Sequence, residues 1–131
     1  MLSRGKQRLT RAQVGKTAED AAARYLQVHG YAILERNWRC RLGEIDIVAR
    51  QGKELVFVEV KGRTSDELAR PADAVNARKQ ERLAALARAY LARSIEGECP
   101  CRFDVVEVLM TGGGAVSEIT LWRGAFVVRS A

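Results

Sequence analysis

The sequence has few features of a protein that is stabilised by disulfides or metal ions, or anchored in a membrane. Its three cysteines, an odd number, fit reduced cytoplasmic thiols better than a disulfide framework. Cys99 and Cys101 lack partners at the spacing that a zinc site needs. Apolar runs such as Leu55 to Val58 are too short to cross a membrane, and no apolar stretch of a signal peptide follows the basic N-terminus. We therefore expect a cytoplasmic protein without membrane association.

Common cofactor and nucleophile motifs are also missing. There is no Ser-His-Asp set, no phosphate-cradling Gly-x-x-x-x-Gly-Lys loop and no dinucleotide fingerprint. The sequence also has no repeat, low-complexity run or linker that would divide it. We therefore expect one domain over residues 1–131, with residues 1–10 as a flexible basic segment.

Positive charge is concentrated in the N-terminal third. The net charge is +6, and residues 1–41 hold nine Lys or Arg against three acids, whereas the remainder has thirteen of each. A basic surface favours polyanions, nucleic acid first, although a merely basic soluble protein is the alternative.

The order of apolar patterns predicts an α/β (α+β) fold. A capping box at Thr10–Gln13 opens a helix that Gly30 ends. A polar loop is expected at residues 62–70. The other expected elements are strands at 31–34, on both sides of a turn at 50–54, at 102–110, at 116–122 and at 125–128, and a helix from Pro71 to about Arg93.

Charged residues interrupt the two apolar strands of segment 43–63. Asp46 lies in the first strand, and Glu59 and Lys61 lie in the second. Because side chains alternate along a strand, Glu59 and Lys61 share a face, and Val56 and Val58 belong to the opposite face, which we expect to be the core side.

The turn fixes how the two strands pair. If Gly52-Lys53 is a two-residue turn, Gln51 lies opposite Glu54, which places Asp46 opposite Glu59 and Glu44 opposite Lys61. Opposed carboxylates repel unless a cation lies between them, and Mg²⁺ binds one or two carboxylates while sharing phosphate oxygens. A cross-strand ladder of ion pairs on a solvated face is the alternative.

Asp46 followed by Glu59-Val-Lys61 resembles the motif of the PD-(D/E)xK nuclease superfamily, although position 45 is Ile where the superfamily name has Pro. More closely, the segments YAILERN (31–37), GEID (43–46), LVFVEVK (55–61) and RFD (102–104) resemble the uncharacterised YraN-like bacterial proteins. That family is grouped with Holliday-junction-resolvase-like nucleases. The resemblance covers about residues 12–128 and implies a restriction-endonuclease-like mixed β-sheet flanked by two main helices.

The resemblance also implies a catalytic site. It assigns Asp46, Glu59 and the Val60 carbonyl to Mg²⁺ (or Mn²⁺), and Lys61 to the attacking water. Glu19, on the first helix, would be an additional metal or water ligand; a solvated helix glutamate is the alternative.

Several residues are candidates for contacts with nucleic acid. Trp38 is interleaved with arginines, a pattern suited to stacking a base, although a core tryptophan on an edge strand is the alternative. Gln80 resembles a glutamine of some nuclease branches, but Ala84 stands where those have tyrosine. Arg63 could hold a phosphate or be a solvated loop arginine. The complete set is Arg36, Trp38, Arg39, Arg41, Arg63, Lys79 and Gln80.

Together these features predict a metal-dependent endonuclease that hydrolyses phosphodiester bonds in structured DNA, such as junctions, flaps or damaged sites. One alternative is a catalytically silent nucleic-acid-binding module of the same fold. Another is an interaction protein whose second helix docks a partner or an anionic membrane surface. A homodimer stays open, because junction-cutting relatives pair.

Overall fold

The computed structural model describes residues 8–65, 77–93 and 99–126. The expected start of the second helix and most of the basic N-terminal segment lie outside these ranges. The elements in chain order are α1 (Arg11–Val28), β1 (Ala32–Cys40), β2 (Gly43–Gln51), β3 (Glu54–Thr64), α2 (Ala77–Arg93), β4 (Cys101–Met110) and β5 (Val116–Phe126). None of the helices in the described ranges is long and apolar enough to cross a membrane.

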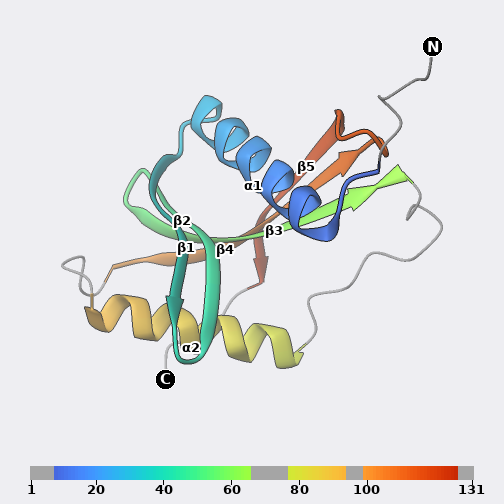
Figure 1. The fold of residues 1–131 in the computed structure, drawn as a ribbon. Coiled ribbons are helices and arrows are strands. Elements are labelled where there is room, and N and C mark those ends of the chain that lie inside the picture. The colour runs from blue at the N-terminus through green and yellow to red at the C-terminus, as the bar shows by residue number, and fades with distance from the viewer. Residues whose placement is uncertain (1–7, 66–76, 94–98, 127–131) are drawn as a thin grey trace, which may run out of the picture.

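The strands form one mixed sheet in the order β1-β2-β3-β4-β5. Only the β3–β4 pair is parallel, and α2 belongs to the connection between these two strands. Figure 1 shows α1 against one face of the sheet and α2 against the other. The α+β expectation is therefore confirmed, with two helices flanking a five-stranded mixed sheet.

Both faces of the central strand are buried, which corrects the expectation of a single core face. Val56 and Val58 pack in the cluster beneath α1, whereas Leu55 and Phe57 pack in the cluster beneath α2. A strand between two layers needs apolar residues on both sides. The face that carries Glu59 is thus a core face along its first half, and its charged residues begin where that core ends.

The predicted capping box at the start of α1 and the predicted helix end at Gly30 are both confirmed. Thr10 and Gln13 form a reciprocal capping box. At the other end, the Tyr31 N–H donates to the Leu26 carbonyl at 2.9 Å and the Gly30 N–H donates to the Gln27 carbonyl at 3.2 Å. Gly30 has φ 90°, so this is a Schellman motif that needs a left-handed residue.

Three expected strand boundaries were wrong. β1 continues to Cys40 rather than ending at position 34, and β3 continues to Thr64, so Arg63 lies on a strand and not in a loop. The two expected C-terminal pieces form the single strand β5, which Gly124 bends with φ 59°. Long-range pairing with neighbouring strands extends these segments beyond their apolar runs.

A polar network occupies the sheet on the α1 side, around Asp104, whose side chain is fully buried. Its carboxylate accepts hydrogen bonds from the Tyr31 hydroxyl at 2.7 Å, from Arg102 Nε at 2.9 Å and from the Gly124 N–H at 2.9 Å. Arg102 also forms an ion pair with Glu54 at 2.6 Å. This geometry gives Arg102 and Asp104 a structural role, because each of their partners belongs to the scaffold.

Gly62 lets α1 approach β3 closely. A Cβ at this position would lie 2.7 Å from Ala18 Cβ and 3.1 Å from Met110 Cε. We expect Gly62→Ala to reduce the free energy of unfolding by about 1–3 kcal/mol, because the helix must shift. Gly15→Ala is the matched control, since a Cβ there meets nothing within 4 Å. Urea unfolding of both variants tests this, and equal stabilities would contradict it.

Candidate active site

The site forms where β2 separates from β3. The expected register is confirmed, because Gln51 pairs with Glu54 and the ladder continues to the pair Ile47–Val58. The ladder ends there, one pair short of Asp46 and Glu59, whereas β3 remains paired with β4 as far as Thr64. Beyond Val58, β3 therefore has an edge that no longer pairs with β2.

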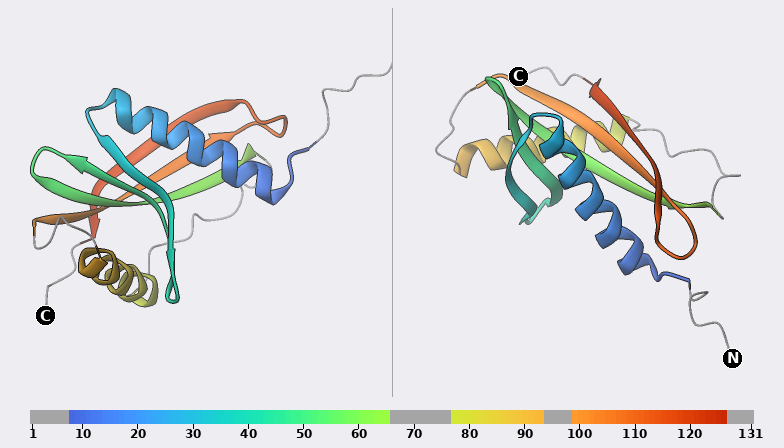
Figure 2. Two further views of the ribbon diagram at one scale, coloured as in Figure 1. Left: turned by 60° about the vertical axis from the view of Figure 1, so that its left-hand side comes forward. Right: turned by 90° about the horizontal axis from the view of Figure 1, so that it is seen from above.

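β2 turns over at Asp46. Ile47 packs in the cluster beneath α1, but Ile45 packs in the cluster beneath α2. Residues two apart on a regular strand share a face, so the strand must change orientation between them. The β1–β2 hairpin accordingly curls toward α2 (Figure 2). The expected pairing of Glu44 with Lys61 is therefore wrong, because the β2–β3 ladder ends at Ile47–Val58, before it reaches Glu44. On its other side Glu44 pairs with Arg39 of β1.

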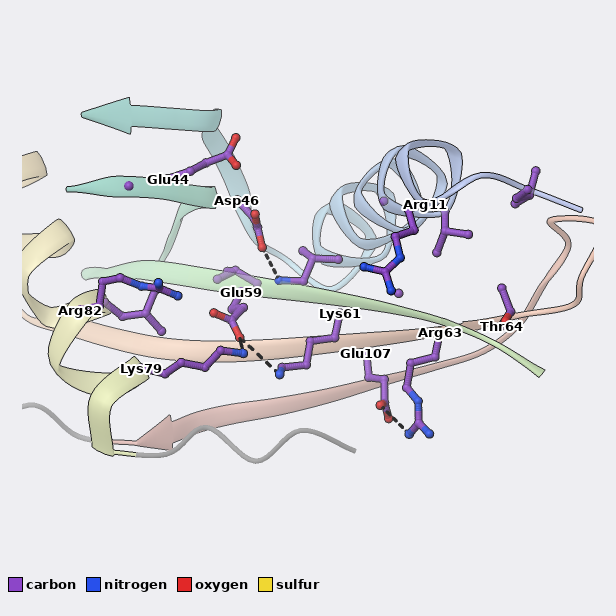
Figure 3. Close-up of a pocket in the computed structure, with 18 residues that line it drawn as sticks. Arg11, Glu44, Asp46, Glu59, Lys61, Arg63, Thr64, Lys79, Arg82 and Glu107 are labelled. Atoms are coloured by element: carbon purple, nitrogen blue, oxygen red, sulfur yellow. Dashed lines mark hydrogen bonds and ion pairs between the residues drawn. The ribbon is translucent and has the colours of Figure 1, made fainter. Parts of the chain in front are cut away.

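The bend brings the Asp46 carboxylate to the open edge of β3. Its Oδ2 accepts a hydrogen bond from the Val60 N–H at 2.8 Å, in place of a continued ladder (Figure 3). The N–H and C=O of one strand residue point to the same edge, so the Val60 carbonyl also faces the edge where Asp46 lies.

Burial raises the pKa of Asp46 to about 6. The Val60 N–H opposes this shift, and the negative charges of Glu19, Glu59 and Glu44 add to it. A carboxylate in this position is therefore held near three other acids in a partly dehydrated environment. Such a setting favours a cation or a proton.

Glu59 projects from β3 toward two ammonium groups. Its Oε2 lies 3.7 Å from Lys61 Nζ on the same strand and 3.6 Å from Lys79 Nζ on α2. The two contacts are close enough for ion pairs but too long for hydrogen bonds. Within the described ranges this buried oxygen has no hydrogen-bond partner. These ion pairs come from β3 itself and from α2, so they are not the cross-strand ladder that was the alternative to a metal site.

These side chains line one groove with a volume of about 900 Å³. Figure 3 shows its acids on β2, β3 and β4 and its cations on α1, β3 and α2. The lining thus combines acids with cations from three elements, and such cations suit contacts with a phosphate chain. The charged residues of the lining are Glu44, Asp46, Glu59, Glu107, Arg11, Lys61, Arg63, Lys79 and Arg82.

The donor set fits Mg²⁺ or Mn²⁺ through two carboxylates and a carbonyl. Mg²⁺ typically binds one or two carboxylates, and keeps waters or phosphate oxygens in its other positions. Glu59 Oε2 has no hydrogen-bond partner in the described part of the chain, and the pKa of Asp46 is raised; a cation would resolve both features. Among the described residues, no group of three or more His, Cys, Asp or Glu side chains is arranged to hold a metal ion.

Glu19 is held by β1. Its Oε1 accepts hydrogen bonds from Asn37 Nδ2 at 2.7 Å and from Arg36 Nη2 at 3.2 Å. Its side chain is 14% exposed, so it is not the solvated helix glutamate of the alternative reading. Arg36, expected to contact nucleic acid, is bound to this helix, and it also donates to Asp20 at 2.6 Å.

The other predicted nucleic-acid contacts are divided between two regions. Trp38 lies against α2, with its ring 5.3 Å from that of Tyr90 and with Arg93 over it at 5.8 Å. This is the packing of an edge-strand core residue.

Arg39 is paired with Glu44, and Arg41 is exposed beside the β1–β2 turn. Gln80 lies on α2 outside the groove lining, whereas Arg63 and Lys79 line the groove. Arg63 forms an ion pair with Glu107 at 3.3 Å. The arginines at 36, 39 and 41 are therefore outside the groove lining, although Arg39 contacts it through Glu44.

Sequence reasoning missed several residues of the site. Arg11 and Arg82 line the groove. In the sequence, each is typical of an arginine on the solvent-exposed face of a helix. Asn37 contacts Glu19 from the middle of a strand, and no local pattern distinguishes it. Gly62, directly after Val60-Lys61, gave the one available signal, since an isolated glycine in a strand marks close backbone approach.

The fold and the groove define the class of protein. Two helices flank a mixed sheet, and an Asp on one strand and Glu-x-Lys on the next line the same groove, in agreement with the restriction-endonuclease-like arrangement. Residues 18–108 match the family described as "Uncharacterised protein family UPF0102". The chain belongs to this family, the YraN-like family that its motifs resemble.

Individual relatives carry the same family name. The UPF0102 protein of Moorella thermoacetica is 48% identical over 119 residues, which cover 90% of this chain and 98% of the relative. The UPF0102 protein of Symbiobacterium thermophilum is 54% identical over 96 residues, covering 73% and 81%. That of Nitrosomonas europaea is 46% identical over 112 residues, covering 86% and 92%.

Proposed function

We propose that this protein is a metal-dependent endonuclease that hydrolyses phosphodiester bonds in structured DNA, such as junctions, flaps or damaged sites. The observation that carries the proposal is the convergence of Asp46, Glu59 and Lys61 on one groove, with Glu59 Oε2 lacking a hydrogen bond within the described ranges. Mg²⁺ or Mn²⁺ would be held by the two carboxylates and the Val60 carbonyl, and would supply Lewis-acid stabilisation of the phosphate.

The residues of the chain have distinct tasks in this proposal. Asp46 is oriented by the Val60 N–H, which leaves its carboxylate facing the edge of β3. Lys61 is 17% exposed and lies next to Glu59, a place from which its ammonium group can hold a water or stabilise charge on the phosphate. Lys79 can take a similar place from the opposite wall of the groove.

The cations of the groove suggest the path of a bound DNA backbone. Lys61 and Arg63 are two residues apart on one strand face, about 7 Å along β3. Arg11 lines the groove from the first turn of α1. We propose that the DNA backbone follows β3 from Asp46 toward Thr64. Arg63→Ala should then weaken DNA binding at all sequences and lower the salt slope by about one unit.

A silent nucleic-acid-binding module is favoured by one specific observation. Lys61 and Lys79 neutralise Glu59 without a metal. The two candidates differ in what divalent cations do. The endonuclease requires them for a reaction, whereas a silent module binds DNA equally well in chelator.

A cleavage panel tests the proposed activity. Single strands, duplex, flaps and four-way junctions are incubated with Mg²⁺ or Mn²⁺ and with chelator. We expect cutting of a structured substrate that falls by at least about 100-fold in Asp46→Ala, Glu59→Ala and Lys61→Ala. Lys53→Ala, an exposed turn residue, is the control. Cutting that survives all three substitutions, or no cutting of any substrate, would contradict the proposal.

A further inference from the structure

Asn37 has a left-handed backbone in the middle of β1. Its φ is 56°, and within the described ranges it is the one non-glycine residue with positive φ. Such a conformation is uncommon outside turns, and asparagine tolerates it better than most residues. The β1–β2 turn lies at residues 41–42, so chain reversal does not require it.

The left-handed residue reverses the faces of β1. Arg36 reaches Glu19 on α1, whereas Trp38 packs against Tyr90 on α2. Residues two apart on a regular strand would share a face, so β1 turns over at Asn37. In the β1–β2 register, Arg36 pairs with the residue after Asp46 and Trp38 with the residue before it. Asn37 therefore lies opposite Asp46, where β2 turns over too.

The same distortion gathers two donors on one carboxylate. Consecutive strand residues normally point to opposite faces. Here Asn37 Nδ2 and Arg36 Nη2 both donate to Glu19 Oε1, at 2.7 Å and 3.2 Å. The second contact of Arg36, to Asp20, ties the arginine to the next residue of the helix. Glu19 is thereby fixed in one orientation, close enough for its charge to act on Asp46.

We infer that Asn37 is a positioning residue for the proposed metal site and that it acts through Glu19. Its backbone forms the bend opposite Asp46, and its amide holds Glu19, which lies outside the groove lining, beside that bend. With a metal bound, Glu19 would orient water beside it rather than hold the metal itself. This inference rests on the proposed function.

A double-mutant cycle in Mn²⁺ affinity tests the inference without relying on activity. Asn37→Gly keeps access to positive φ but removes the amide. Asn37→Asp keeps the shape but replaces the donor with an acceptor that faces Glu19. We expect each variant to lose about 10- to 100-fold in Mn²⁺ affinity by calorimetry, the usual effect of losing an outer hydrogen-bond partner.

The Glu19→Ala background distinguishes positioning from general destabilisation. If Asn37 acts through Glu19, Asn37→Gly should cause no further loss of affinity in Glu19→Ala protein. Thermal unfolding of each metal-free variant checks that the fold is retained. Unchanged affinity in both Asn37 variants, or the same additional loss in the Glu19→Ala background, would overturn the inference.

Failure of the inference and failure of the proposed function give different results. Wild-type protein that binds no Mn²⁺ would overturn both. Binding that is abolished in Asp46→Ala but unaffected in Asn37→Gly and Asn37→Asp would overturn the role of Asn37 alone.

Discussion

Replacing Asp46 with Asn should stabilise the metal-free protein at neutral pH, by about 1–3 kcal/mol. Burial raises the pKa of this carboxyl from its ordinary value of 3.8 to about 6. The folded state therefore binds more protons than the unfolded state between about pH 4 and pH 6. Stability falls as pH rises through that interval and stays lower above it, because the charged carboxylate is buried.

Asparagine removes this penalty while its side-chain oxygen can still accept the Val60 N–H. The stabilisation should therefore be full above about pH 6 and vanish below about pH 4. Urea unfolding at about pH 7.5 and about pH 4 measures it. Glu118→Gln, which neutralises an exposed acid on β5, is the control and should change stability little. A destabilised Asp46→Asn at neutral pH would contradict the account.

Mn²⁺ should reverse the order of stability of the wild type and Asp46→Asn. A ligand that binds only the folded state stabilises it in proportion to the logarithm of its concentration. Mn²⁺ should raise the unfolding midpoint of the wild type and leave that of Asp46→Asn unchanged. Gain of stability with loss of the metal response is typical of a residue kept for function at a cost in stability.

Replacing Asp104 with Asn should have the opposite effect, a loss of about 3–5 kcal/mol. This carboxylate is fully buried and accepts from Tyr31, Arg102 and Gly124. Asparagine offers one acceptor oxygen, and its amide N–H would face another donor. Arg102 would lose the carboxylate of Asp104 and keep that of Glu54.

Urea unfolding at neutral pH measures this loss beside Asp46→Asn. Both substitutions remove one negative charge and preserve shape, so the comparison isolates the surroundings of each aspartate. An Asp104→Asn protein as stable as the wild type would show that the network contributes nothing to the fold.

The contrast between Asp46 and Asp104 shows where sequence reasoning ends. Both are aspartates within apolar strands, and the sequence alone gives them similar surroundings. Their environments depend on partners far along the chain: the Tyr31 hydroxyl for Asp104, and the end of the β2–β3 ladder for Asp46. Resemblance to a known motif favoured Asp46, but the hydrogen bonds that distinguish the two require the fold.

The turn between β2 and β3 was predictable because it is local. Gly52, with φ 59°, accepts the turn conformation, and the confirmed register follows from its position. The bends at Asn37 and Asp46 were not predictable, because the sequence pattern predicts regular strands in which side chains alternate between the two faces. The approach of Lys79 to Glu59 also depends on how α2 docks, which no pattern within the helix specifies.

The central claim is that Asp46, Glu59 and the Val60 carbonyl hold a divalent cation. A crystal structure of the protein grown with Mn²⁺, with anomalous data at the manganese edge, tests it most directly. We predict one anomalous peak within ligand distance of both carboxylates and the carbonyl, with Lys79 displaced from Glu59. A groove without a peak at millimolar Mn²⁺, and with Lys61 and Lys79 still on Glu59, would contradict the claim.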